Sequence, residues 1–573
     1  MFAIFMNEHL KHTLALETYV QRSFNYYTNM VDANSVPYFN IFWTNPAEAA
    51  HDWPDSGDVT ARQLQAVIMA RHMTGVALPI EKVWRQKILA QLNPQTGLIH
   101  RPNTHYSQGD EGVSVIGDQA LTLYALVTAY HAGGDTDLLK AIQKMLEGLR
   151  QQYEDSNKVV SALTHGFIIK SLMICGRLMH SDLALDLAQA LVKKVFVDPQ
   201  IFPSANIFPR GAHMHTYLRT LVGVADYATY MNDSNLLDRV EAFFRHVKSM
   251  TTRFGFLPEV MERQGDIISC ETCTIMDYLG LAVTLANHGY PEYWGEVERT
   301  VRNHLIESQV CEASWLHSDS SRPDTAQFTW CDIDIRMIGG YAGWSSPNHI
   351  LAACETLPWG GPELREKIRA FQNCCGGSGT HAFFIAWKNA ARFANGTLSV
   401  NLHLDKLLPQ AEIRCFQPYQ GLLSIQLKEA CTVKIRLPEF VKPDEIQVAA
   451  EAVTGAEKVS EDFLDLGPRG AGETIRVTYP LPVFQEEISV GNSGFRQYRY
   501  CITWKGDTVV KMEPLGNDYA TGYSDFDKKD VECFYGQNGP GELYQRAHLL
   551  NDATPELSPI YLDDGILDFW HIR

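Results

Sequence analysis

Between about residue 60 and residue 394, hydrophobic residues recur every three to four positions, which is the spacing of one face of an α-helix. Near the start of this region, Leu64, Val67 and Ile68 fall on one such stripe. Similar stripes follow at 121–130, 138–149, 167–178, 183–195, 217–230, 236–247, 273–285, 297–306 and 382–393. Short breaks rich in glycine, asparagine and proline separate them, so the pattern predicts helices paired into antiparallel hairpins.

Helical hairpins of this kind can close into a ring, the (α/α)6 barrel, or stack into an open superhelical solenoid. A solenoid requires a fixed repeat period, and the sequence has no visible one. We therefore expect an (α/α)6 barrel over residues 1–394 and place the catalytic domain there.

The pattern changes near Asn395 from a helical period to a period of two. Leu398, Val400 and Leu402 alternate with polar residues, and similar alternation follows at 425–427, 433–437 and 475–479. Short alternating segments between breaks rich in proline and glycine are typical of antiparallel strands in a β-sandwich. We expect an α + β multidomain protein whose residues 395–573 form a β-sandwich region, although the pattern weakens after about residue 517.

The charge balance limits the partners of the protein. The chain has 49 lysines and arginines against 67 aspartates and glutamates, a net charge of −18. Such a charge repels phosphate backbones and anionic membranes, so we expect neither nucleic acid nor membrane as a partner. No apolar run reaches the roughly 20 residues of a membrane helix. The start of the chain does not resemble a signal peptide, and twelve scattered cysteines fit a reducing compartment, so a cytoplasmic protein is expected.

Two adjacent cysteines, Cys374 and Cys375, give the clearest chemical signal. They stand shortly before the helix expected from Ala382, and a thiol near a helix N-terminus has a lowered pKa because the helix dipole favours the thiolate. The alternative is that both are small buried hydrophobic residues, since free cysteine is among the most buried residue types.

A second signal is Glu271 followed by Cys273. On a continuous helix, side chains two positions apart diverge by about 200°, so they could share a ligand only at a junction between a loop and a helix. The apolar stripe begins at Cys273, which favours such a junction. Together with Cys374 and Cys375 these residues would offer one oxygen and three sulfurs, a set suited to zinc. The alternative is a core cysteine beside a carboxylate favoured by the helix dipole.

Further candidates are carboxylates, an aromatic residue and two histidines. Glu259 and Glu262 lie a little upstream of Glu271 and could act as acid or base. Trp53 stands among three aspartates, and acidic residues beside an aromatic face are common in sugar clefts and also in ordinary loops. The full set of further candidates is Glu259, Glu262, Trp53, Asp52, Asp55, Asp58, His213 and His215.

In combination, these motifs resemble glycoside hydrolase family 127, the β-L-arabinofuranosidase group. The resemblance rests on Glu271-Thr272-Cys273 before a long helix, then Cys374-Cys375, then the strand pattern of Asn395–Leu402. The stretches 472–483 and the helix after His213 also resemble that family. The resemblance implies an (α/α)6 barrel followed by β-sandwich domains.

The resemblance also implies roles for single residues. Zinc would be held by Glu271, Cys273, Cys374 and Cys375. Cys374 would attack the anomeric carbon with retention of configuration. Glu259, or alternatively Glu262, would be the acid/base. The substrate, an oligosaccharide or glycoside with a terminal furanose, would meet His213, His215, Asp55 and Trp53.

The chain also departs from the family's pattern. Gly376-Gly377-Ser378 stands where the family usually has Pro-Pro-Asn, and the segment between the two zinc motifs is longer than usual. These changes put the identity of the sugar in doubt more than the mechanism.

Two other functions remain open, as does assembly into a homo-oligomer. One is an inverting hydrolase or polysaccharide lyase that uses carboxylates such as Asp55 and Asp58. The other is a zinc-stabilised carbohydrate-binding protein without catalysis.

Overall fold

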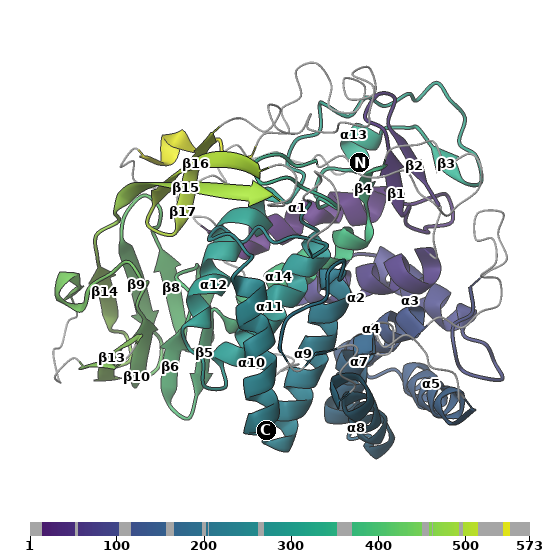
Figure 1. Ribbon diagram of the computed structural model, residues 1–573, viewed down its shortest axis with the longest axis horizontal. Helices are drawn as coiled ribbons and strands as arrows, with labels where there is room; N and C mark the ends of the chain where they lie inside the picture. The colour runs from purple at the N-terminus through teal and green to yellow at the C-terminus, as the bar shows by residue number, and fades with distance from the viewer. Residues whose placement is uncertain are drawn as a thin grey trace.

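The computed structural model describes residues 14–51, 55–101, 116–155, 166–197, 202–203, 205–261, 269–351, 369–449, 458–460, 462–491, 497–513 and 543–550. A helical region occupies most of the chain up to residue 389, and β-sheets lie beside it (Figure 1). The α-helices are α1 (Leu16–Asn29), α2 (Thr60–Thr74), α3 (Ile80–Gln91), α4 (Ile116–Gly133), α5 (Thr136–Asp155), α7 (Ile169–Met179), α8 (Asp182–Val197), α9 (Met214–Met231), α10 (Ser234–Lys248), α11 (Thr272–Ala286), α12 (Tyr293–Thr300), α13 (Ile333–Arg336) and α14 (Cys374–Asn389). Short π- and 3-10 helices add η1 (Asp55–Val59), η2 (Val301–Leu305), η3 (Pro443–Glu445) and η4 (Ala547–Leu550).

Six of the described helices form a closed ring. Each contacts the next in the order α2, α4, α7, α9, α11 and α14, and α14 contacts α2 again. A second set packs around the ring: α1 and α3 contact α2, α5 contacts α4, α8 contacts α7, α10 contacts α9, and α12 contacts α11. The helical region expected from the sequence is thus confirmed.

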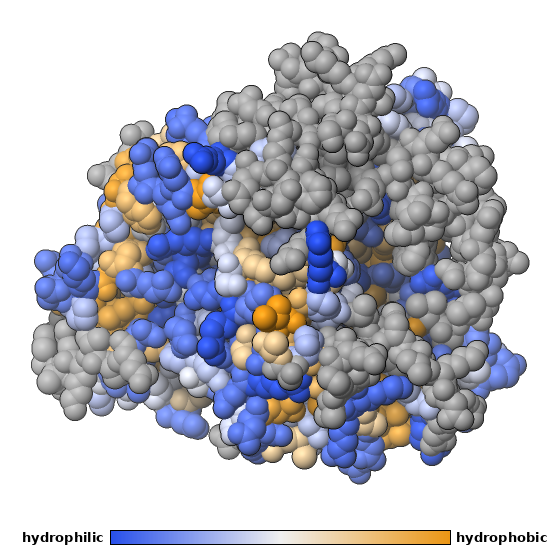
Figure 2. All heavy atoms as spheres, in the orientation of Figure 1, coloured by the Kyte–Doolittle hydropathy of each residue, from blue (hydrophilic) through white to orange (hydrophobic). Residues whose placement is uncertain are grey.

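The sequence explains which helices are inside. Nearly every residue of α2 and of α11 is buried, as expected for helices that meet neighbours on all sides. The outer helix α10 instead has a single buried stripe that includes Leu237, Val240 and Phe244, and its remaining residues are mainly polar. In the described part of the face shown in Figure 2, hydrophilic residues predominate and apolar residues form small patches.

Most of the strands follow the helical region. They are β1 (Asn40–Phe42), β2 (Glu48–Ala50), β3 (Phe328–Thr329), β4 (Arg369–Gln372), β5 (Ala391–Ala394), β6 (Thr397–Val400), β7 (Lys406–Leu407), β8 (Ala411–Cys415), β9 (Leu422–Leu427), β10 (Cys431–Arg436), β11 (Gln447–Ala449), β12 (Lys458–Ser460), β13 (Phe463–Arg469), β14 (Thr474–Thr478), β15 (Val483–Gly491), β16 (Gln497–Lys505) and β17 (Thr508–Glu513).

Two five-stranded sheets share one hydrophobic core. Their strand orders are β12-β13-β10-β6-β5 and β11-β14-β9-β8-β7. Alternate residues such as Val433 of the first sheet and Ile425 of the second point into the same buried cluster. Strand pairing is antiparallel as expected, with the exception of β6 and β10, which run parallel.

Two further sheets belong with the helical region. The sheet β15-β16-β17 places Trp504 and Val509 in the helical core, and the side chain of Asn303 in η2 bonds the backbone of Asp507 and of Val509. The small sheet β3-β2-β1-β4 was not expected from the sequence, because its strands are only two to four residues long and come from distant segments.

Among the described residues, no helix combines the length and the apolar character that a membrane crossing needs.

Candidate functional site

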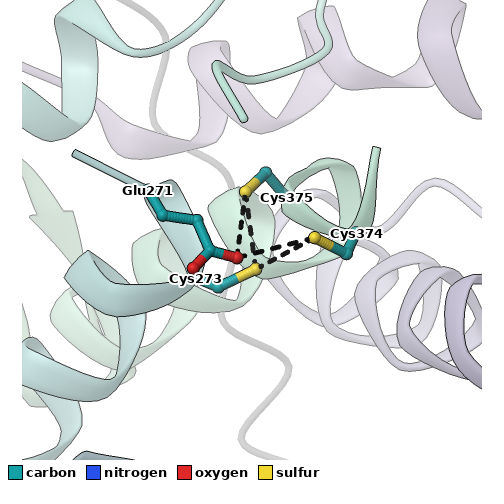
Figure 3. A group of neighbouring side chains, drawn as sticks. All are labelled: Glu271, Cys273, Cys374 and Cys375. Carbon is teal, nitrogen blue, oxygen red and sulfur yellow. Dashed lines mark hydrogen bonds between the residues drawn. The ribbon is translucent and has the colours of Figure 1, made fainter. Parts of the chain in front are cut away.

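Four side chains from the starts of two neighbouring helices, α11 and α14, converge (Figure 3). Cys273 belongs to α11, and Cys374 and Cys375 begin α14. The sulfur of Cys273 lies 3.6 Å from that of Cys374 and 3.4 Å from that of Cys375. Glu271 completes the group, since its Oε1 lies 3.6 Å from the Cys374 sulfur and 3.9 Å from the Cys375 sulfur. All four side chains are buried.

Glu271 reaches the cysteines because it precedes the helix. It is the N-cap residue of α11, its backbone is extended (φ −101°, ψ 132°), and its side chain makes no capping hydrogen bond. The carboxylate is therefore free to turn toward α14. The junction between a loop and a helix that the sequence predicts at this point is confirmed.

The helix that carries the two cysteines differs from the prediction. α14 begins at Cys374 rather than near Ala382, and it ends at Asn389, after which residues 391–394 form β5. The glycines after the cysteines conceal the helix, because glycine is a poor helix former. Here their lack of a side chain is required: a Cβ on Gly377 would lie 2.7 Å from the backbone oxygen of Arg62, and one on Gly379 would lie 2.3 Å from the Tyr341 ring.

The group fits a tetrahedral zinc ion. The ligand atoms of all four residues lie within 4.8 Å of one another. Zn–S bonds of about 2.3 Å in a tetrahedron separate the sulfurs by about 3.8 Å, close to the distances found here. Burial raises the pKa of the Cys273 and Cys375 thiols well above the usual range, so without a cation these thiols stay protonated. A bound zinc ion would reverse this, because coordination deprotonates a thiol.

Glu259 is held beside this group by backbone pairing on both sides. Its backbone carbonyl accepts a hydrogen bond from the Met214 N–H, and its backbone N–H donates to the Ser269 carbonyl. The Ser269 hydroxyl also donates to the Glu259 carboxylate at 2.8 Å. Glu259 is therefore fixed between the start of α9 and the segment that leads into α11.

His213 connects Glu259 to the buried group. This residue is the N-cap of α9, and its Nε2 lies 3.2 Å from Glu271 and 3.9 Å from Glu259. Its side chain is 41% exposed, whereas those of Glu259 and Glu271 are 12% and 3% exposed. The site thus opens to solvent through His213 and Glu259.

The two carboxyl groups differ in their acidity. Burial and the nearby charge of Glu271 raise the pKa of Glu259. Burial also acts to raise the pKa of Glu271, but the hydrogen bond from His213 and the charges of His215 and His213 outweigh it and lower that pKa to about 2. Of two neighbouring carboxyl groups, the one with the raised pKa can serve as an acid and the one with the lowered pKa stays an anion.

A chain of buried polar residues begins at the Cys273 sulfur and connects Arg62, His215 and Asp277. His215 donates or accepts through Nδ1 at 2.6 Å from Asp277, and its Nε2 lies 3.2 Å from Nη1 of Arg62. Arg62 also forms a salt bridge with Asp58 and points Nη1 at the Cys273 sulfur, 3.8 Å away. A sugar hydroxyl could bind His215 only by replacing one of these partners, so its role in substrate binding stays a prediction.

Sequence reasoning missed Arg62 and Asp277. Arg62 stands four positions after Asp58, the spacing of an ion pair on one helix face, and this is the one signal that could have identified Arg62. Four predicted residues cannot be compared with the structure: Asp52, Trp53 and Glu262 lie outside the described residues, as does the side chain of Asp55, whose backbone begins η1.

Comparison with known proteins finds similar structures but no similar sequences. No protein-family model matches the sequence, and no curated protein matches it. Among solved structures, a GH127 β-L-arabinofuranosidase from Geobacillus stearothermophilus is 14% identical with a TM-score of 0.55, covering 86% of this chain and 80% of that one.

Two further structures are similar. A second GH127 β-arabinofuranosidase is 14% identical with a TM-score of 0.59 and coverage of 87% and 83%. A protein described as a glycoside hydrolase is 13% identical, with a TM-score of 0.55 and 84% of each chain covered. The resemblance to family 127 is therefore confirmed as a likeness of fold across most of the chain.

Proposed function

We propose that this protein is a retaining glycoside hydrolase that releases a terminal furanose, β-L-arabinofuranose or a related sugar, from an oligosaccharide or glycoside. The reaction uses a zinc-bound Cys374 as nucleophile and Glu259 as acid/base. In this proposal the closed helical ring is an (α/α)6 barrel, residues 1–394 are the catalytic domain, and residues 395–573 are the β-sandwich region.

One observation carries the proposal: a carboxylate and three thiols with the mutual distances of zinc ligands lie directly beside a solvent-accessible glutamate. A purely structural zinc site would not need an acid at its open side. The fold shared with two arabinofuranosidases supports the choice of sugar.

Cys374 is the residue that forms a covalent bond to the sugar in this proposal. When bound, zinc supplies charge that keeps the thiols deprotonated and holds Cys374 in place. The Cys374 sulfur forms a bond to the anomeric carbon while the bond from that carbon to the leaving oxygen breaks. The covalent intermediate is then a sugar bound to Cys374 through sulfur.

Glu259 moves the proton in both steps. In the first step its carboxylic acid donates a proton to the leaving oxygen, which departs as an alcohol. In the second step the same carboxylate takes a proton from water, whose oxygen attacks the anomeric carbon as the carbon–sulfur bond breaks. Two displacements retain the anomeric configuration. The partly exposed His213 would bind a sugar hydroxyl at the entrance.

The test is hydrolysis of a panel of aryl furanosides, with the anomer of the first product identified by NMR. We expect turnover of the β-L-arabinofuranoside or a close relative with retained configuration. Cys374→Ser should lower kcat/KM at least about a thousand-fold, as expected when a nucleophile is lost.

Cys501→Ser, a half-buried thiol on β16, is the matched control and should keep full activity. Turnover that survives Cys374→Ser would contradict the cysteine nucleophile, and an inverted first product would contradict the double displacement. No turnover of any furanoside in the panel would contradict the assigned class of sugar.

A further inference from the structure

A cavity of about 240 Å³ lies inside the helical ring, and none of Glu271, Cys273, Cys374 and Cys375 lines it. Residues of α7, α9, α11, α14 and β5 line it. On α11 its lining extends from Met276, just past Cys273, to His288 beyond the end of the helix. At 1.5 Å per residue, the stretch from Cys273 to Asn287 spans about 21 Å. The cavity therefore extends from the second turn of α11 to the end of the ring opposite to the candidate active site.

The lining carries an excess of positive charge. The charged residues are four cations and two carboxylates, namely Lys170, Arg177, Arg219, Arg392, Asp226 and Asp277. Both carboxylates already have partners, since Asp226 accepts a hydrogen bond from Lys170 and Asp277 binds the Nδ1 of His215 at 2.6 Å. Four cations against two carboxylates leave the lining with a net charge of about +2.

Arg219 concentrates this charge at a buried position. Its side chain is only 3% exposed, and it stacks over the rings of Tyr124 and Phe167. Nη1 lies 3.8 Å from Asp277, beyond hydrogen-bond distance, and neither Nε nor Nη2 has a hydrogen-bond partner. A buried N–H group without an acceptor lowers the stability of the fold, so a bound ligand that accepts from Nε and Nη2 would be stabilised there.

The helix dipole does not account for the charge of Arg219. Cations near a helix C-terminus offset the negative end of the helix dipole, and this could account for Arg177 in the last turn of α7. Arg219 instead lies in the second turn of α9, close to the positive end of that helix. The dipole therefore does not stabilise it there.

We propose that this cavity is a binding site for a small molecule that carries a phosphate or carboxylate group, and that Arg219 binds that group. The planar guanidinium offers parallel N–H donors that match two oxygens of either group. Arg392 of β5, an exposed residue in the lining, adds charge that would attract the ligand from solvent. The proposal does not rest on the proposed glycosidase activity, although Asp277 belongs both to this lining and to the buried polar residues beside the cysteines.

The experiment is isothermal titration calorimetry of the full-length protein with inorganic phosphate and, separately, with citrate, at pH 7 and constant ionic strength. We expect saturable binding of at least one probe, and the probe that binds more tightly identifies the group. Arg219→Met should weaken its affinity at least tenfold. Arg219→Lys, which keeps the charge but loses the paired donors, should show an intermediate loss.

Three further variants make the result decisive. Arg392→Leu, an exposed substitution that spares the core, should weaken affinity several-fold if Arg219→Met does not fold. Arg499→Leu removes an exposed arginine of β16 outside the cavity and should bind as wild type. Glu259→Gln alters the candidate active site and should also bind as wild type. Absence of saturable binding of both probes would overturn the proposal, as would equal affinities in wild type, Arg219→Met and Arg392→Leu.

Discussion

At the scale of single residues, Glu271 and Glu259 show how neighbouring carboxyls acquire different roles. Glu271 accepts hydrogen bonds from His213 and from the thiol of Cys374, which stabilise its anion. Glu259 lies next to that anion, and burial together with this like charge favours its protonated form. The geometry thus pairs an ionised carboxylate with a carboxyl group that favours its protonated form, as the proposed ligand and the proposed acid require.

We predict that Glu259→Gln separates substrates by their leaving group. Alkyl furanosides need protonation of the leaving oxygen and should lose about a hundred- to ten-thousand-fold in kcat/KM. Aryl furanosides with an acidic leaving group need no acid in the first step and should lose less in that step. Steady-state and single-turnover kinetics on both substrates measure the difference, and equal losses would contradict the role of Glu259.

The pH profile offers a second readout of the same variant. The acid must be protonated, and its pKa is raised above the ordinary value of 4.5, so wild-type activity should persist above that value and fall as the pH rises through the raised pKa. Glu259→Gln cannot titrate, and the alkaline limb that wild type shows should disappear. An unchanged alkaline limb in the variant would assign that ionisation to another group.

The sequence predicted the members of this site better than their surroundings. Glu271, Cys273, Cys374 and Cys375 stood out because carboxylate and thiol ligands form a recognisable set. Arg62 and Asp277 did not, because a single buried charge inside a helix leaves no periodic signal and its partner comes from a different helix.

At the scale of elements, the site depends on how closely α14 approaches α2. The glycines after Cys375 let α14 and α2 touch, and Arg62 of α2 also lies near the Cys273 sulfur of α11. A Cβ at Gly377 would lie 2.7 Å from the Arg62 backbone oxygen, a separation that the helices can relieve only by moving apart.

We predict that Gly377→Ala lowers the free energy of unfolding by about 1–3 kcal/mol, the usual range for overpacking, and weakens zinc binding because α14 carries two of the ligands. Denaturant unfolding and zinc titration measure the two effects. Gly117→Ala in α4 is the matched control: nothing lies within 4 Å of its Cβ, and the variant should be neutral or slightly stabilised. Equal stability of the Gly377→Ala protein and wild type would contradict the packing argument.

Helices and strands with a regular pattern could be predicted from the sequence, and the irregular ones could not. The stripes at 217–230 and 236–247 match α9 and α10 closely. The start of α14 was missed because its first turns are rich in glycine. Strand β4 was missed because its partner β1 lies more than 300 residues away in the chain.

At the scale of the whole molecule, a buried ionic network joins the helical region to the paired sheets. Glu298 of α12 forms salt bridges with Arg302 of η2 and with Arg436 of β10. It also accepts a hydrogen bond from the backbone of His403 at 3.1 Å. Burial opposes the charge of Glu298, but Arg436 and Arg302 outweigh it and hold the pKa well below the ordinary value of 4.5.

We predict that Glu298→Gln destabilises the protein by about 3–5 kcal/mol, because it leaves buried arginines without their counter-ion. Since the folded-state pKa is lowered, the stabilisation is present above pH 4.5 and is lost as the pH falls below it. Wild-type stability should therefore decline more steeply in acid than that of the variant. Denaturant unfolding across this pH range measures both effects.

Glu147→Gln is the control, since its pair with Arg150 on α5 is half-exposed and should contribute less than about 1 kcal/mol. Equal losses in Glu298→Gln and Glu147→Gln would show that the network does not hold the two regions together.

The most direct test of the central claim is intact-protein mass spectrometry after incubation with a furanose-configured probe, of the cyclophellitol or haloacetamide type. The account predicts one adduct on the wild-type protein, located at Cys374 by peptide mapping and absent from Cys374→Ser. An adduct that persists in Cys374→Ser, or that maps to a carboxylate, would contradict a cysteine nucleophile in this fold.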